Sequence, residues 1–485
     1  METREENRLL TELLVELGGL AQSFAIVAAP IGPVQSVRLV NGRAVKDKEP
    51  LIRPAPGQNS LAAAYEWCAA GPGRVLVVLD WHMLANAPGH WRLLIDALPG
   101  IRQPKGCSVD DPPSLVVFVA PSLNLEPHNP LKGNLPVLAF DPPSRDALRA
   151  VANGIAELPA NGEGEAVVDA LCGLSADTAE QVCAETIARG NGWDAESLRT
   201  ARRQAIKEGG LELWQSAGAF GGLGRFQSFV EYELVPWLRH PKLAIKRILM
   251  AGVPGVGKSY CARWLAHRLG CECARISVPS LKAGVVGASE ANLRRCLRTI
   301  DAMAKHSPLV VVVDEIDTIA RDGLDGGTSS GMFAELLTWL QESKSQAIVL
   351  GTLNNLDKLD AALESRFSSR FFVDLPTLSE RREVAGIYLG DVGCVNATHA
   401  AARIAEMTDG YSSRELAETI VPDVARLSQL ACDDETISLV VNRTVPSSRT
   451  QTAQLERMRS AASTLRRANS EADGSDPSPS RRVMA

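Results

Sequence analysis

Apolar and polar residues follow two different periods along the chain, and the period changes repeatedly. Residues 5–17 place leucines three and four positions apart, which predicts an amphipathic helix. Helical patterns also cover 62–69, 90–98 and 145–158. Between these patterns lie four short apolar runs: Phe24–Ala29, Val75–Leu79, Leu115–Ala120 and Val137–Phe140. Short continuous apolar runs that alternate with helices are typical of a mainly parallel α/β sheet.

The N-terminal part of the chain, residues 1–158, has an acid at a predicted strand end but no phosphate-binding loop. Asp80 follows the run that ends at Leu79, and it resembles the acidic end of a strand in a nucleotide-binding fold. We interpret residues 1–158 as a degenerate RecA-like α/β domain without a competent ATP site. An unrelated small α/β domain is the alternative. Helical patterns then begin after Ser175 and Asp194, so residues 159–218 are predicted to be a helical connector.

The most specific motif follows another apolar run, Ile248–Ala251. Residues 252–259 read Gly-Val-Pro-Gly-Val-Gly-Lys-Ser and fit the spacing G-x-x-x-x-G-K-[ST], with a helical pattern directly after them. Such a loop turns its backbone N–H groups toward phosphates at the start of a helix. We expect Lys258 to reach the β/γ-phosphates and the Ser259 hydroxyl to ligate Mg²⁺. The other nucleotide contacts predicted here are Pro254, Gly255, Val256, Gly257 and Tyr260.

Two further apolar strands end in side chains that suit ATP hydrolysis. Val310–Val313 runs into Asp314 and Glu315, which we expect to hold Mg²⁺ through water and to deprotonate the attacking water, respectively. The next strand, Ile348–Thr352, ends close to Asn354. A carboxamide at that position can bridge the attacking water and the γ-phosphate.

Three arginines downstream are candidates for contact with phosphate. Arg366 can act as an arginine finger on the γ-phosphate of a neighbouring subunit, and Arg370 is the alternative for that role. Arg414 stands in the predicted first turn of a helix, where acids are normally preferred. A basic side chain there makes sense if it folds over bound phosphate.

In this order the pieces resemble the AAA+ ATPase family over roughly residues 219–440. Three segments, Gly221–Leu223, Val286–Glu290 and Asn354–Asp357, look like the AAA proteins first known as a hypothetical plastid reading frame. The resemblance implies a P-loop AAA+ domain, with a parallel sheet between helices and a small helical lid. It also implies that Gly222 contacts the nucleotide, that ATP and Mg²⁺ bind, and that ATP promotes a ring, with a hexamer as the expected form.

The resemblance also sets the expected boundaries of the second half. We expect the large ATPase subdomain at 219–377, the helical lid at 378–445 and a mostly disordered tail at 446–485. One position departs from many AAA unfoldases, because Val285 stands where they carry an aromatic pore-loop residue. Threading of a polypeptide through a ring is therefore not implied.

Composition restricts the function further. The formal net charge of −6 gives no reason to expect nucleic acid as a partner. No apolar run approaches the roughly 20 residues of a membrane helix, and the acidic start does not resemble a secretory signal. We expect a cytoplasmic ATP hydrolase with reduced thiols that remodels or regulates an unidentified protein. A nucleic-acid loader or motor and a nucleotide-gated scaffold are the alternatives.

Overall fold

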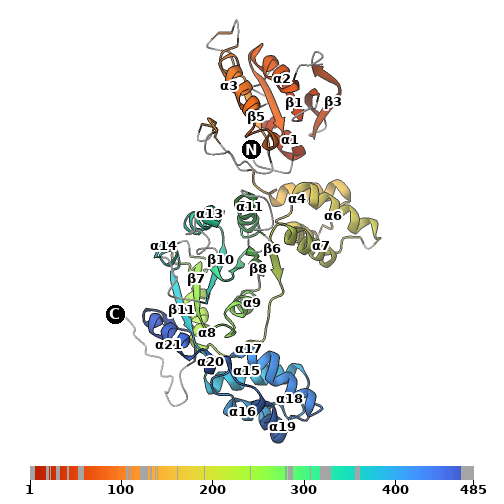
Figure 1. Cartoon of the computed structure of the whole chain (residues 1–485). Helices are drawn as coiled ribbons and strands as arrows, with labels where there is room; N and C mark the ends of the chain where they lie inside the picture. The colour runs from red at the N-terminus through yellow and green to blue at the C-terminus, as the bar shows by residue number, and fades with distance from the viewer. Residues whose placement is uncertain are drawn as a thin grey trace, which may run out of the picture. The chain divides into compact units, whose positions relative to one another are not determined.

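The computed structural model describes residues 6–470 except for short stretches, and Figure 1 shows the chain. The residues left out within that range are 18–20, 22, 29–32, 41–42, 53–58, 105–106, 109–110, 121–128, 132–133, 137, 139, 161, 191, 241, 279–280, 282–287, 306, 317–328 and 355–360. Val285, the start of the segment Val286–Glu290 and most of Asn354–Asp357 therefore lie outside the described residues. The chain divides into two compact units, Met1–Arg202 and Arg203–Ala485.

The first unit is built on a five-stranded sheet with the order β3-β2-β1-β4-β5. Strands β1 (Ser23–Ala28), β4 (Arg74–Leu79) and β5 (Leu115–Phe118) run parallel, as three of the apolar runs predict. Strands β2 (Val34–Val40) and β3 (Arg43–Ile52) form an antiparallel hairpin beside β1. The run Val137–Phe140 gives no strand at Leu138 or Phe140, and its other two residues lie outside the described part.

Successive side chains along these strands point to opposite faces of the sheet. Both faces carry buried apolar side chains. Ile26, Val75 and Val77 pack with leucines of α1 (Glu6–Leu17). Their neighbours Ala25, Val27, Leu76 and Val78 pack instead against α2 (Ser60–Ala69) and α3 (Pro88–Arg102). Helices on both faces of a largely parallel sheet are the expected α/β arrangement.

Four helices complete the first unit and lead to the second. They are α4 (Arg145–Ile155), α5 (Gly162–Leu171), α6 (Ala176–Ala188) and α7 (Ala195–Glu208). Ser175 caps α6 by accepting a hydrogen bond from the Thr178 amide at 3.1 Å, as its position before a helical pattern predicts. Arg202 is buried and donates to the carbonyl oxygens of Asp169 and Cys172, which ties α7 to the end of α5.

The second unit contains a seven-stranded sheet with the order β12-β11-β7-β10-β9-β8-β6. All neighbouring strands run parallel except β6 (Leu211–Trp214), which is antiparallel to β8 (Glu272–Ile276). The other strands are β7 (Arg247–Gly252), β9 (Leu309–Val313), β10 (Ala347–Leu353), β11 (Ser369–Val373) and β12 (Arg466–Arg467). Because β7 lies between β10 and β11, the loop after it opens at the centre of the sheet's carboxyl edge.

Helices surround this sheet, and a separate helical lid follows it. The helices of the sheet region are α8 (Gly224–Phe229), η2 (Val230–Leu234), η3 (Val235–Trp237), α9 (Lys258–Leu269), α11 (Ala288–Met303), α13 (Ser329–Glu342) and α14 (Ala361–Glu364). The lid, blue in Figure 1, comprises α15 (Leu378–Asp391), α16 (Ala397–Met407), α17 (Ser413–Glu415), η5 (Leu416–Ile420), α18 (Val421–Leu427) and α19 (Asp434–Arg443). The lid has its own apolar core. These observations confirm the predicted α/β fold with a helical lid.

The structure differs from the sequence expectations at three places. Residues 211–214, expected in a helical connector, form β6, because Gly209 and Gly210 end α7 and Leu-Glu-Leu-Trp alternates like a strand. Residues 447–470, expected to be mostly disordered, form α20 (Ser447–Thr450), α21 (Thr452–Ala461), η6 (Ala462–Thr464) and β12. Phe371 and Phe372 pair with Arg466 and Arg467 there, and this backbone pairing compensates for the few apolar side chains.

Cysteine pairing is the third difference. Cys394, after α15, forms a disulfide with Cys432, before α19, where reduced thiols were expected. The two residues lie 38 positions apart, and Arg414 falls inside the loop that they close. Spacing alone could not reveal the pair, because only the folded lid brings these two turns together. Within the described residues, no helix combines the length and apolar character needed to cross a bilayer.

Candidate functional site

The loop between β7 and α9 adopts a conformation that glycine makes possible. Gly252 has a φ of 154°, and a Cβ added there would lie 2.0 Å from the Val373 carbonyl oxygen. Gly257 precedes the first turn of α9 with a φ of 91°. Residues other than glycine rarely adopt these φ values. The loop therefore turns directly from the central strand into the start of a helix, where an anion is stabilised by unpaired N–H groups.

Lys258 begins α9 and is only 6% exposed. Its Nζ donates hydrogen bonds to the carbonyl oxygens of Gly252 at 2.7 Å and Val253 at 2.8 Å. The ammonium group thus lies against the loop's own backbone, inside the turn. This position keeps a positive charge next to the helix start.

A cluster of oxygen atoms lies at the ends of β9 and β10, next to Ser259. The hydroxyls of Ser259 and Thr352 donate to Oδ1 of Asp314 at 2.7 and 2.6 Å. The backbone N–H of Glu315 donates to the Thr352 hydroxyl at 2.9 Å. Thr352 was not singled out from the sequence, although its place two residues before Asn354 puts it at the same strand end. It joins the two acids to the strand that carries Asn354.

Glu315 adopts a left-handed backbone conformation with a φ of 48°. For a residue with a side chain, such a conformation costs on the order of 1–3 kcal/mol and often occurs at functional sites. Asn354 Nδ2 donates to Glu315 Oε1 at 3.0 Å, so the two predicted catalytic groups are in direct contact. The amide group fixes the orientation of the carboxylate that is expected to act as the base.

Hard oxygen donors with this arrangement suit Mg²⁺. The ion prefers oxygen ligands, is held in proteins by one or two carboxylates and keeps several waters. Ser259 Oγ and Asp314 Oδ1 are 2.7 Å apart and lie directly after the phosphate loop and after β9. The residues present therefore fit the expected ion.

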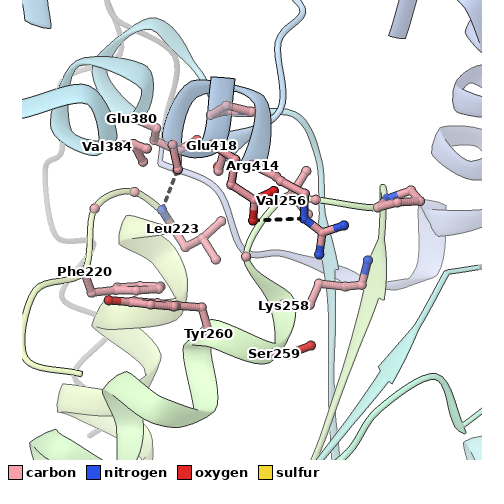
Figure 2. A pocket seen from close by; sticks show the side chains of 18 of the residues that line it. Phe220, Leu223, Val256, Lys258, Ser259, Tyr260, Glu380, Val384, Arg414 and Glu418 are labelled. Atoms are coloured by element: carbon pink, nitrogen blue, oxygen red, sulfur yellow. Dashed lines mark hydrogen bonds and ion pairs between the residues drawn. The ribbon is translucent and has the colours of Figure 1, made fainter. Parts of the chain in front are cut away.

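The lid contacts the phosphate loop through Arg414. The backbone N–H of Arg414 donates to the Gly255 carbonyl oxygen at 2.8 Å. Its side chain is exposed, and its Nε lies 3.8 Å from an oxygen of Glu418. Figure 2 shows the dashed contact between Arg414 and Glu418. Arg414 thus lies next to the phosphate loop and lines the same cavity as Lys258.

On the other side of the loop, backbone and aromatic groups form a wall. The N–H of Gly222 donates to Glu383 at 2.8 Å, and the N–H of Leu223 donates to Glu380 Oε1 at 2.6 Å. Phe220 stacks on Tyr260, with ring centroids 6.1 Å apart and planes 8° apart (Figure 2). A flat apolar wall beside a phosphate loop can hold a planar base.

The C-terminal end of the described chain also reaches this wall. Glu380 is 1% exposed, and its carboxylate accepts hydrogen bonds from Asn469 Nδ2 at 2.8 Å and from the Ser470 N–H at 2.7 Å. Asn469 Oδ1 in turn accepts from the N–H of Asp374 at 2.8 Å. No motif in the sequence marks Asn469, which was assigned to the tail. Only the addition of β12 to the sheet brings it here.

One cavity of about 470 Å³ is lined by most of these groups. The predicted residues that line it are Gly222, Pro254, Gly255, Val256, Gly257, Lys258, Ser259, Tyr260, Asp314, Glu315, Asn354 and Arg414. Thr352, Glu380, Tyr388 and Asn469 line it as well, and the sequence did not single them out. Burial raises the pKa of the Tyr388 hydroxyl, and the neighbouring Tyr260 and acids add to this effect. The phenol therefore remains a neutral hydrogen-bonding group at physiological pH.

Arg366 and Arg370 lie elsewhere. Neither is among the described residues that line the cavity. Arg370, on β11, forms an ion pair with Glu364. Arg366 Nη1 donates to the Ser365 hydroxyl at 2.9 Å, and within the described part of the chain it makes no ion pair. Of the two candidates, Arg366 is the one whose charge is not compensated by an acid among the described residues.

Comparisons with known proteins identify a domain family in the second half of the chain. Residues 248–375 match the model of the ATPase family associated with various cellular activities. The chain carries an AAA domain. Over a longer stretch, the chain is 27% identical to the uncharacterized AAA domain-containing protein ycf46 of Guillardia theta. This match spans 369 residues and covers 71% of this chain and 70% of that protein. The ycf46 protein of Trieres chinensis is 26% identical over 326 residues, or 62% of this chain and 64% of that protein.

Other similarities are confined to part of the chain. ATPase family gene 2 protein homolog B of Rattus norvegicus is 32% identical over 181 residues, which cover 36% of this chain and 24% of that protein. A crystal structure of the FIGL-1 AAA domain in complex with ADP aligns with a TM-score of 0.44 and 22% identity, covering 54% of this chain and 96% of that one. The chain thus carries an AAA domain, and it is similar to the ycf46 proteins over most of its length.

Proposed function

We propose that the AAA domain binds ATP with Mg²⁺ and hydrolyses it to ADP and phosphate. One observation carries the proposal: a single cavity is lined by the phosphate loop, by Asp314 and Glu315, by Asn354 and by Arg414. These groups come from separate strands and from the lid. Their convergence combines charge neutralisation, water activation and closure over phosphate in one place.

The phosphate groups would meet positive charge from two directions. On ATP binding, the Lys258 ammonium and the N–H groups at the start of α9 face the β- and γ-phosphates. Arg414 approaches from the lid, and its backbone contact with Gly255 keeps it at the loop. Ser259 and Asp314 are the residues that would hold Mg²⁺. When bound there, Mg²⁺ would supply positive charge that offsets the negative charge of the phosphate groups.

Glu315 is proposed as the general base. Its carboxylate accepts a hydrogen bond from Asn354 Nδ2 at 3.0 Å, which holds one oxygen and aims the group. The attacking water would give its proton to this carboxylate as its oxygen bonds to the γ-phosphorus, while the bond from that phosphorus to the bridging oxygen breaks and ADP leaves. Asn354 supports the same water through its amide. General-base catalysis of this kind contributes about 10²–10⁴-fold to a rate.

We also propose that the active site is completed by a second copy of the chain. Arg366 does not line the cavity of its own AAA domain, and within the described residues no acid pairs with it. In this proposal the cation serves catalysis on the nucleotide of a neighbour in a ring. Arg370 is the weaker candidate, because Glu364 already pairs with it. The ring would use ATP turnover to remodel or regulate a protein partner.

Two substitutions test the hydrolysis proposal. Lys258→Ala should abolish nucleotide binding, whereas Glu315→Gln should bind ATP and lose at least about 10²-fold in turnover. Glu342→Gln, an exposed acid on α13, is the matched control and should behave like the wild type. Near-normal turnover by Glu315→Gln would disprove the role of Glu315. Stimulation of turnover by single-stranded DNA, with none by protein substrates, would favour a nucleic-acid partner instead.

A further inference from the structure

Arg275, on β8, contacts the carboxylate that the proposed function assigns to Mg²⁺. Its Nη2 lies 3.3 Å from Asp314 Oδ2, the oxygen that the hydroxyls of Ser259 and Thr352 leave open. The two acid oxygens therefore have different partners. Oδ1 faces the hydroxyl groups of Ser259 and Thr352, and Oδ2 faces a cation from the adjacent strand.

The strand register explains why these side chains meet. Arg275 is directly opposite Val312 in the parallel pair of β8 and β9, and Asp314 lies two residues beyond Val312. Residues two apart on a strand point to the same face, as do directly opposed residues. Arg275 and Asp314 therefore share one face of the sheet, at its carboxyl edge.

The edge strand β6 holds Arg275 from its other side. Glu212 is directly opposite Arg275 in the antiparallel pair, and its Oε2 lies 3.6 Å from Nη1. The guanidinium carbon lies 5.3 Å from the centre of the Trp214 ring. Stacking over an aromatic ring and a second acid restrict the guanidinium group from two directions.

These contacts are partly sheltered from water. The side chains of Arg275, Glu212 and Asp314 are 33%, 27% and 23% exposed. A partly buried pair is screened less by water and salt than a pair on an open surface. The Arg275 fork can therefore keep the Asp314 carboxylate from rotating. Such a rotation would move Oδ1 away from Ser259.

We infer that Arg275 is a positioning residue for the Mg²⁺ ligand Asp314, and that Glu212 and Trp214 hold Arg275 in place. This inference rests on the proposed function. It predicts that Arg275 acts on the metal requirement of nucleotide binding and leaves binding without metal unchanged. Groups that orient metal ligands in this way typically contribute about 10–100-fold to metal affinity.

The test uses the full-length chain and a non-hydrolysable ATP analogue, β,γ-imido-ATP, with binding measured by calorimetry across a Mg²⁺ titration and in EDTA. Arg275→Met should raise the half-saturating Mg²⁺ concentration about tenfold. It should leave the Kd in EDTA unchanged. Arg275→Lys keeps the charge but loses the fork. This variant and Glu212→Gln should each raise the half-saturating Mg²⁺ concentration by a smaller factor.

Arg268→Met is the matched control, because it removes an arginine that forms a two-point ion pair with Glu231, on the surface of the same domain. It should leave the Mg²⁺ requirement at the wild-type value. The inference is overturned if Arg275→Met leaves the half-saturating Mg²⁺ unchanged or lowers it. If Arg275→Met does not fold, an unchanged value in both Arg275→Lys and Glu212→Gln overturns it.

The same measurements separate this inference from the proposed function. A wild-type chain that binds no nucleotide at all would defeat the proposed function, and the inference with it. A wild-type chain whose binding is strengthened by Mg²⁺, beside an Arg275→Met variant with the same Mg²⁺ dependence, would leave the ATPase proposal standing and remove Arg275 alone.

Discussion

The two sheets of this chain share a pattern but differ in the elements that come after their first parallel strands. Each has an apolar strand that ends in an acid, Asp80 after β4 and Asp314 after β9. Each also has a left-handed residue at that point, Asp80 with a φ of 53° and Glu315 with a φ of 48°. The strand-end signal in the sequence is therefore nearly the same in both.

The surroundings of the two acids are different. Asp314 accepts hydrogen bonds from Ser259 and Thr352 and faces Arg275. Within the described residues, the Asp80 carboxylate has no hydrogen-bond or ion-pair partner, and a short helix (Trp81–Met83) follows it directly. An acid at a strand end becomes part of a site only when neighbouring elements supply partners for it.

The difference originates at the first parallel strand of each sheet, β7 in the second unit and β1 in the first. In the second unit, β7 runs into the phosphate loop and α9, which supplies Lys258 and Ser259. In the first unit, the hairpin β2–β3 follows β1, and α2 begins only afterwards with Asn59 as its cap. The helix start that would bind phosphate is displaced from the strand end. We expect the first sheet to bind a protein or to support the chain, and not to bind nucleotide.

The largest effect is expected at Arg366, the proposed arginine finger. The first sheet has no residue assigned to that role. Arg366→Ala should bind ATP normally but hydrolyse it about 10³-fold more slowly, since a finger acts on transition-state charge. Mixing Arg366→Ala with Lys258→Ala should restore some turnover, because a mixed interface pairs an intact Arg366 with an intact phosphate loop. Steady-state ATPase assays against protein concentration measure both effects.

Two outcomes would change this view. A mixture that stays inactive while the variants co-assemble would remove the shared site, as would full activity of a dilute monomer. A defect in Arg370→Ala in place of Arg366→Ala would keep the shared site and reassign the residue.

The second test asks whether the first sheet is silent. Saturating ATP at roughly 100 times its Kd should stabilise the wild-type chain by about 2.7 kcal/mol. Lys258→Ala should remove this stabilisation completely, because no second nucleotide site remains. Thermal unfolding and equilibrium dialysis with ATP check the prediction. Residual saturable binding in Lys258→Ala would show that the first sheet, or another site, binds nucleotide after all.

Local spacing in the sequence predicts one part of the candidate site. The phosphate loop, the acids after β9 and Asn354 all follow recognisable apolar runs, so their strand-end positions could be predicted. Arg414 was found because a basic residue is unusual in a first helical turn. The cavity brings these residues together.

Several of the residues that the sequence did not reveal depend on contacts between distant segments. Arg275 is an ordinary strand residue until β6 and β9 are placed on either side of β8. Asn469 lies in a polar stretch whose composition suggests disorder, yet β12 pairs with β11 and carries it to Glu380. Cys394 and Cys432 meet only in the folded lid. None of these contacts leaves a periodic signal in a single sequence.

Asn469 provides a third prediction, which concerns how the second sheet is closed at its edge. Asn469→Ala removes the acceptor of the Asp374 N–H and a donor to the buried Glu380 carboxylate. Leaving such groups unsatisfied should cost about 1–3 kcal/mol and weaken nucleotide binding, because Asn469 lines the cavity. Urea unfolding and ATP-analogue binding measure the two effects. Asn442→Ala, on the exposed side of α19, is the control and should change neither.

The smallest effect is expected at Glu415, which belongs to the lid and has no counterpart in the first sheet. Burial alone would raise the pKa of this carboxyl, but hydrogen bonds from Ser412 and Ser447 outweigh burial and hold the pKa below the ordinary value of 4.5. A carboxyl whose pKa is lower in the folded state stabilises the fold above its ordinary pKa, and this contribution is lost as the pH falls through the folded value. The lid should therefore lose stability on acidification below about pH 4.5. Glu415→Gln should lower stability at neutral pH and flatten this acid dependence, as measured by urea unfolding at a series of pH values.

The exposed Glu456→Gln on α21 is the control and should keep the wild-type slope. An unchanged slope in Glu415→Gln would mean that the cap at Ser412 does not depend on the charge of Glu415.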